Sequence, residues 1–288
     1  MIPNNNLSVL PFYKSIEQQN ARKWWVYGKV YPLFTPAGFI LPFQIIRPDR
    51  GGQGISTFKV YTKDGQLYGD YTAQIAGMGF VIKSFFQYGY EIIVFPGQMP
   101  VFTAMDNGQY YIELSDDADT WYSEIFTVVN DISGYLKLEW WDVEDFVMEA
   151  GTIVYANPAF KNVLYLRSEI AKPEYEFNED VIERDGYTFP VKQVSQKKYR
   201  FSFLASEYLL DVLRFVRMSD YVRVSKGGQT YIDIDSFLIT PDWEDNGDVA
   251  VVDAEFTTGT VAKKNGMGYI QAERGDFNND FNDDFNNQ

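Results

Sequence analysis

The chain has 288 residues, which is enough to bury a sizeable core without disulfides or metals. It carries 25 Lys and Arg against 40 Asp and Glu, and a net charge of −15 repels the nucleic-acid backbone, so we expect no specific nucleic-acid binding. It has no cysteine and no histidine, which excludes thiolate nucleophiles, Cys/His zinc sites and imidazole bases, and we expect no catalytic residues, cofactor or metal.

The first 35 residues mix amides with aromatic residues and show no period of 2 or 3.6 residues. We predict an N-terminal arm over residues 1–35. Trp24 and Trp25 lie in this segment, where either docking onto a neighbouring subunit or packing within the chain would bury them. No apolar run here or later approaches the roughly 20 residues of a membrane helix, so we expect no membrane insertion.

Residues 36–132 contain short β-like runs separated by turn residues. Aromatic residues make up 17% of the whole chain, and aromatic rings suit half-buried pleated surfaces. Between Gln109 and Leu114, alternate side chains fall on opposite faces of a strand, which is typical of a sheet with one wet side. The segment therefore predicts an immunoglobulin-like β-sandwich.

Two acidic clusters invite functional hypotheses. The turn at Asp116, Asp117 and Asp119 offers oxygen ligands for Ca²⁺, but no glycine stands where a calcium loop requires it, so we predict a charged turn. The glycines of residues 51–54 lack the pattern of a phosphate-binding loop and predict a flexible loop.

The second acidic cluster could form an acid/base pair beside a sugar-stacking platform, or solvated carboxylates beside core tryptophans. Its members are Glu139, Trp140, Trp141, Asp142, Glu144 and Asp145.

Residues 133–265 hold the best-patterned segments. Tyr199, Phe201 and Phe203 alternate with polar residues, which predicts a half-buried strand. Apolar residues then recur at helical spacing from Leu209 to Val216, and the serine at position 206 can act as N-cap, so we predict one α-helix over about 206–218. Strands resume to residue 258. The pattern predicts a β-barrel with one flanking helix.

The C-terminal segment, residues 266–288, is acidic and of low complexity. Phe277, Phe281 and Phe285 recur at a spacing of four within Asp-Phe-Asn units. Burying one phenylalanine is worth about 1.5–3 kcal/mol, so three could offset the entropy of ordering the segment on a partner. Two alternatives stay open: an assembly arm, and a solubilising tail that contacts nothing.

Residues 184–258 carry a resemblance to a known family. The pattern begins at Arg184-Asp185-Gly186 and continues through the strand Tyr199-Arg200-Phe201-Ser202-Phe203, the helix from Glu207 to Arg217, the hairpin at Gly227-Gly228 and the closing strands to Phe256. In its pattern and order of elements, this segment resembles the ring-forming β-barrel of phage distal tail (baseplate hub) proteins. The composition of the whole chain, with its aromatic-rich sandwich and its Asn/Asp-rich C-terminal segment, is similar to that of structural proteins of Bacteroidetes-type phages. The sandwich precedes the barrel here, whereas distal tail proteins usually carry it afterwards.

The resemblance implies a non-enzymatic virion protein, made in the host bacterial cytoplasm, that forms a homo-oligomeric ring in a phage tail, baseplate or connector. Its partners would be copies of itself and other virion tail or connector proteins. The alternatives are a carbohydrate-binding or adhesion module that uses Trp140 and Trp141, and a glycosidase that depends on carboxylates. For every hypothesis the expected fold class is all-β.

Overall fold

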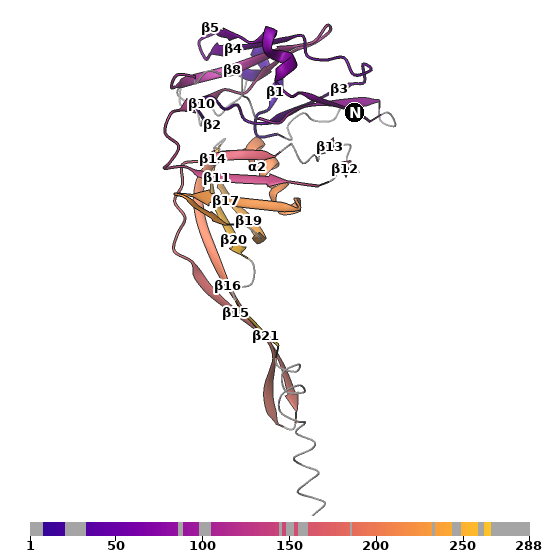
Figure 1. The fold of residues 1–288 in the computed structure, drawn as a ribbon. Helices are drawn as coiled ribbons and strands as arrows, with labels where there is room; N and C mark the ends of the chain where they lie inside the picture. The colour runs from indigo at the N-terminus through magenta and orange to yellow at the C-terminus, as the bar shows by residue number, and fades with distance from the viewer. Residues whose placement is uncertain are drawn as a thin grey trace, which may run out of the picture.

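This computed structural model describes residues 8–20, 33–85, 89–97, 105–143, 146–147, 153–154, 161–184, 186–231, 234–243, 249–258 and 262–265. Most of the described residues lie in strands and few in helices, which confirms the expected all-β class. Two β-rich halves pack together, and a long hairpin projects from the second half (Figure 1).

One sheet, sheet A, runs through both halves of the molecule. Its strands are β1 (Phe12–Tyr13), β2 (Leu33–Pro36), β4 (Thr57–Thr62), β5 (Leu67–Asp70), β8 (Gly108–Ser115), β9 (Thr120–Ser123), β10 (Phe126–Val129), β11 (Leu136–Trp141), β14 (Asn162–Leu166), β17 (Tyr221–Lys226) and β18 (Gln229–Tyr231). Strand β2 pairs in parallel with β10, and through Phe34 and Tyr165 with β14. These few residues join the two halves of the sheet.

The N-terminal half is β-sandwich-like. A second sheet, sheet B, has the order β3 (Phe43–Pro48), β7 (Tyr90–Phe95) and β6 (Val81–Phe85), and it lies against the N-terminal part of sheet A. Phe43 and Phe95 of sheet B meet with ring centroids 4.9 Å apart, and Phe58 of sheet A lies 6.3 Å from Phe95. All three are fully buried. The immunoglobulin-like topology stays a prediction.

The C-terminal half forms around a third sheet, sheet C, of order β15-β16-β20-β19, with β21 paired to the far end of β16. Its strands are β15 (Glu174–Arg184), β16 (Tyr187–Ser206), β19 (Ile234–Trp243), β20 (Val249–Thr258) and β21 (Ala262–Asn265). Phe201 and Phe203 point into a core that also contains Trp140 of sheet A and Phe256 of β20. The arrangement resembles half a barrel; a closed tail-protein barrel stays a prediction.

Short helical elements and one separate hairpin complete the described chain. They are α1 (Ile16–Asn20), the 3₁₀ turn η2 (Thr72–Gly77), β12 (Phe146–Val147), β13 (Ile153–Val154), α2 (Glu207–Leu213) and the 3₁₀ turn η4 (Val216–Met218). Among the described residues, no helix combines the length and apolar character needed to cross a membrane.

The helix predicted over 206–218 is shorter than expected. Regular α-helix ends at Leu213, and the chain then tightens into η4, a common way for a helix to finish. Leu209 and Val216 are buried as the apolar spacing requires. Ser206 does occupy the N-cap position, yet its side chain makes no capping hydrogen bond.

Part of the predicted N-terminal arm is wrong, because residues 8–20 belong to the sandwich. Val9 and Leu10 are fully buried, and the ring of Phe12 lies 4.5 Å from that of Phe43. Strand β1 pairs with β9, more than a hundred residues away. A two-residue strand and a five-residue helix are too short to show a period, so the pattern of the sequence misses them.

Candidate functional site

The tryptophans of the predicted sugar-stacking platform are not both available. Trp140 is 1% exposed and lies in the core. Trp141 stacks on Tyr221, with ring centroids 5.3 Å apart and planes 15° from parallel. The adjacent Glu139 is nearly buried and pairs with Lys137 at 2.7 Å. These residues form packing and ion-pair contacts within the half-barrel.

The neighbouring carboxylates are likewise engaged in structural contacts. The backbone amide of Val143 donates to Asp220, and the amide of Asp220 donates to Asp142, each over 2.9 Å. Burial raises the pKa of Asp142, and the carboxylate of Asp220 adds to the rise. This exchange ties the end of β11 to the start of β17. Glu144 and Asp145, the other members of the predicted cluster, lie outside the described residues.

The acidic turn at residues 116–119 is part of a buried network of ion pairs. Arg47 is 1% exposed, and its guanidinium donates to Glu91 over 2.6 Å, to Asp116 and to the carbonyl of Gln53. Arg50 also donates to Asp116, at 2.9 Å. The predicted charged turn therefore faces two arginines, and within the described residues no cluster of three acidic side chains is placed to hold a metal ion.

The same network holds the glycine-rich loop that the sequence predicts to be flexible. The amide of Gly52 donates to Glu91 over 3.1 Å, and that of Gly51 to Asp49 over 2.8 Å. Gly51 and Gly52 have φ angles of 70° and 80°, in the left-handed region that glycine adopts without strain. The loop is fixed by hydrogen bonds, so the network stabilises the sandwich.

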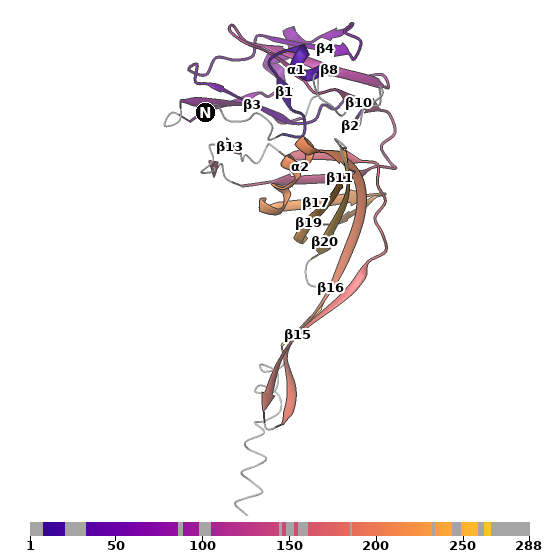
Figure 2. The same cartoon turned by 180° about the vertical axis from the view of Figure 1, so that it is seen from behind.

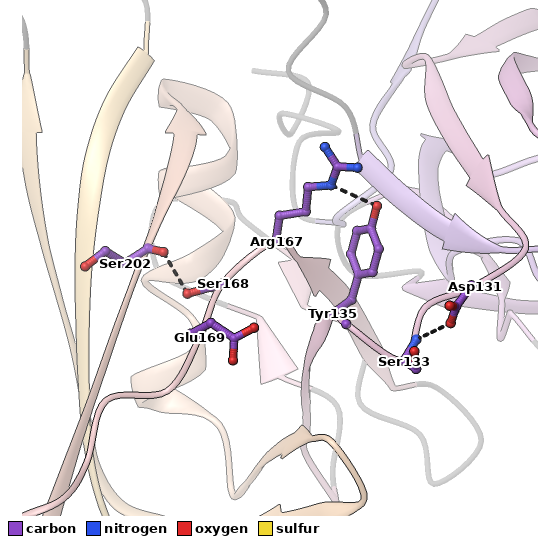
Figure 3. A pocket seen from close by; sticks show the side chains of 8 residues that line it. Asp131, Ser133, Tyr135, Arg167, Ser168, Glu169 and Ser202 are labelled. Atoms are coloured by element: carbon purple, nitrogen blue, oxygen red, sulfur yellow. Dashed lines mark hydrogen bonds between the residues drawn. The ribbon is translucent and has the colours of Figure 1, made fainter.

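An open cavity of about 650 Å³ lies beside the segment that connects β10 to β11 (Figure 3). Its lining residues are Asp131, Ser133, Gly134, Tyr135, Arg167, Ser168, Glu169 and Ser202. Arg167 donates to the Tyr135 hydroxyl over 3.0 Å, and the Ser168 hydroxyl donates to a backbone carbonyl of β16 over 2.7 Å. Glu169 pairs with Lys226 at 2.8 Å. All three contacts join residues of the C-terminal half, so they fix the strands and loops of that half to one another.

The β15–β16 hairpin is the most unusual surface of the described chain. It extends away from the body in both views (Figures 1 and 2). Large apolar side chains lie exposed along it: Phe177 is 72% exposed, Tyr187 70% and Tyr175 63%. Val181 and Ile182 are exposed as well. Such a concentration of exposed apolar side chains on one element is typical of protein–protein or membrane interaction sites.

Strand register shows where this apolar stripe comes from. Tyr175 pairs with Lys197 and Phe177 with Ser195, so both lie on the face of sheet C that carries Tyr199. Within the body, that face is the core face. It continues onto the hairpin, where no described residue covers it. The hairpin thus presents a core-like sheet face to its surroundings, and we call the two aromatic residues on it, Tyr175 and Phe177, the hairpin stripe.

The opposite face of sheet C carries a ladder of ion pairs across three strands. Lys198 pairs with Glu255 at 2.7 Å and with Glu176 at 3.3 Å. Arg200 pairs with Glu255 at 2.9 Å and with Glu174 at 3.0 Å. Each cation is shared between carboxylates, so this face keeps its acidic character.

The assembly residues predicted from the sequence are not among those that the structure describes. Trp24 and Trp25 fall in residues 21–32, and Phe277, Phe281 and Phe285 fall in residues 266–288. The hairpin stripe was missed by sequence reasoning. Alternation of Glu174, Tyr175, Glu176 and Phe177 was its available signal, but alternation predicts a strand and not the absence of a covering layer.

Comparison of the chain with models of known protein families gives no match, and no curated protein is significantly similar to it.

Proposed function

We propose that the chain is a non-enzymatic structural subunit that assembles with copies of itself into a ring of a phage tail, baseplate or connector. The observation that carries the proposal is the hairpin stripe. Tyr175 and Phe177 are 63% and 72% exposed on an element that projects from the body. A monomer gains nothing by exposing them, whereas a neighbouring subunit would bury them.

The edges of sheet C support the same proposal. Its outermost strands are β15 and β19, and in the described chain neither has a partner on its outer side. Unpaired edges invite pairing with another chain. Two different edges on one subunit favour head-to-tail contacts, and head-to-tail contacts close into a ring when the rotation between subunits permits.

The charged face of sheet C suits the lining of a tail channel. Among the described side chains, six acidic residues point to this face against three cations, Lys192, Lys198 and Arg200, and each cation is already paired. The six are Glu174, Glu176, Asp180, Asp242, Asp253 and Glu255. An acidic wall repels phosphate groups, so DNA would pass it without binding. The resemblance to distal tail proteins gives the proposed position in the virion.

Sedimentation velocity of the full-length chain tests the assembly. The wild type is expected to form a discrete oligomer, and the double substitution Tyr175→Ser with Phe177→Ser is expected to shift it to the monomer with an unchanged melting temperature. Leu67→Ser is the matched control, because Leu67 is 55% exposed on β5 of the sandwich. A wild type that stays monomeric at high concentration would contradict the proposal.

Electron microscopy of the assembled species tests the geometry. Closed rings with a central opening are expected, and their inner wall should be acidic. Open filaments or compact two-fold dimers would exclude a ring subunit, even if the hairpin stripe does mediate the contact.

A further inference from the structure

A second cavity lies where the two halves meet, between β2, β14, β16 and α2. Its volume is about 220 Å³. Leu164, Leu166, Phe203 and Leu209 supply apolar walls, and each is at most 6% exposed. Because an apolar cavity of about 150 Å³ can hold benzene, this one has room for the ring of one phenylalanine.

Two polar groups border this cavity. Ser206 is 5% exposed, and its hydroxyl makes no capping hydrogen bond to α2. Arg167 is exposed, and its guanidinium lies 5.4 Å from the ring of Phe34. Among the described residues it has no carboxylate partner. The cavity therefore joins an apolar interior to one hydroxyl and to one cation that contacts Tyr135 and Phe34 but no carboxylate among the described residues, on a chain of net charge −15.

The C-terminal segment carries groups that are complementary to these three features of the cavity: the apolar interior, the hydroxyl and the cation. Asp-Phe-Asn occurs three times in a row, at residues 276–278, 280–282 and 284–286. Each unit offers a carboxylate, a benzyl group and an amide in successive positions. The carboxylate is complementary to Arg167, the benzyl group to the apolar interior, and the amide to the Ser206 hydroxyl.

We propose that this cavity binds one Asp-Phe-Asn unit from the C-terminal segment of a second copy of the chain. The phenylalanine ring fills the cavity, the aspartate pairs with Arg167, and the asparagine hydrogen-bonds to Ser206. The proposal rests on the self-assembly proposed above and names a second contact within it, distinct from the hairpin stripe.

The direction of β21 favours a second copy over the chain's own segment. Asn265 pairs with Lys192, and Ala262 with Ser195, so β21 runs toward the hairpin tip and away from the cavity. Ala205, at the cavity, lies 13 residues further along β16, about 43 Å away at 3.3 Å per residue. Phe277 is 12 residues beyond Asn265 and can span at most about 43 Å, so the chain's own first unit reaches the cavity only if the chain reverses at once and stays fully extended. Phe281 and Phe285 lie 16 and 20 residues beyond Asn265, long enough to reach, but the chain would still have to reverse and run back along β16. A unit from a second copy does not require this reversal.

Photo-crosslinking in the full-length chain tests the contact directly. Phe281→p-azidophenylalanine keeps an aromatic ring in the central unit, and the variant is assembled from an equal mixture of unlabelled and ¹⁵N-labelled subunits. Cross-links to residues 164–167 or 203–209 are expected, with peptide pairs that carry one label each. Cross-links to other segments alone, or pairs only from within one subunit, would overturn the proposal.

Charge reversal separates this contact from the assembly as a whole. Arg167→Glu is expected to weaken subunit association at least about tenfold in sedimentation velocity, since it places like charges together. Arg214→Glu is the matched control, because Arg214 is exposed at the C-terminal cap of α2 and does not line the cavity. Replacing Asp276, Asp280 and Asp284 with Arg in the Arg167→Glu background should restore association.

The outcomes distinguish the two proposals. If Arg167→Glu associates as tightly as Arg214→Glu, the cavity contact is wrong while the proposed self-assembly stands. If the wild type does not associate at all, both fail. Equal melting temperatures of the two variants establish that a loss of association does not come from unfolding.

Discussion

Aromatic and charged residues are buried at one end of the molecule and exposed at the other. In the sandwich, phenylalanines lie in the core and Arg47 is buried with its carboxylates. On the β15–β16 hairpin, aromatic side chains lie exposed, and on the outer face of sheet C the ion pairs face solvent. Buried groups of either kind fix one structure, since removing a partner leaves a cavity or an uncompensated charge. Exposed groups contribute little to folding and are available for contacts with other molecules.

The largest expected effect comes from breaking the core of the half-barrel. Leu213→Asp places a charge where the native side chain is 1% exposed, and it should cost about 4 kcal/mol or more of unfolding free energy. Chemical denaturation measures this loss. Arg214→Asp introduces the same residue at an exposed position of the C-terminal turn and should change stability by less than about 0.5 kcal/mol. Equal effects would mean that α2 does not cover the core.

Removing a buried cation should cost almost as much. Arg47→Met leaves Glu91 buried without an arginine and Asp116 with Arg50 alone, which should destabilise the sandwich by about 3–5 kcal/mol. Arg200→Met on sheet C removes an arginine with an exposed side chain, and its cost should stay below about 1 kcal/mol. Urea denaturation of both variants compares the two regions directly; a similar loss in both would refute the contrast.

Acid should weaken the sandwich through Asp116. Burial opposes its ionisation, but the amides of Ala118 and Asp119 and the guanidinium of Arg47 outweigh burial and lower its pKa. A carboxyl with a lowered pKa stabilises the fold above its unfolded-state pKa of about 3.9, and this stabilisation is lost as the pH falls through the folded-state pKa. Unfolding free energies at pH 5 and pH 3 should therefore differ less in Asp116→Asn than in the wild type; an unchanged difference would show that other groups control acid unfolding.

The smallest effect is expected for the ladder on sheet C. Lys198→Gln removes two partly exposed ion pairs and should change stability by less than about 1 kcal/mol. At 1 M salt, where the screening length is about 3 Å, the difference should vanish. Thermal unfolding at low and high salt measures it. A large loss that persists at high salt would place the ladder among the buried networks.

Local patterns in the sequence predict the elements that have one buried face and one exposed face. The alternation of Tyr199, Phe201 and Phe203 predicts a strand, and that strand is part of β16. Spacing from Leu209 to Val216 predicts the buried face of α2 and η4. In both segments, burial depends on a single neighbouring layer, so periodicity alone identifies the inner face.

Contacts between distant residues escape such patterns. Arg47 lies 44 residues from Glu91 and 69 from Asp116, and nothing in its local sequence marks it as buried. The same holds for the hairpin, since alternation in β15 resembles that of any half-covered strand. Whether a layer covers Phe177 depends on the tertiary fold. For this reason the sequence suggested the chain termini as assembly surfaces and missed the hairpin.

In the proposed assembly, the length of the hairpin would set the distance over which one subunit contacts another. Strand β15 has 11 residues, which at about 3.3 Å each gives a hairpin span of roughly 36 Å, because residues 198–206 of β16 pair with β20 in the body. Because side chains alternate between faces, inserting or deleting one residue in each strand would turn the hairpin stripe to the opposite side. Only changes of two residues per strand preserve it, in steps of about 6.6 Å. If the hairpin sets the spacing of the proposed assembly, related chains should differ in its length by even numbers of residues.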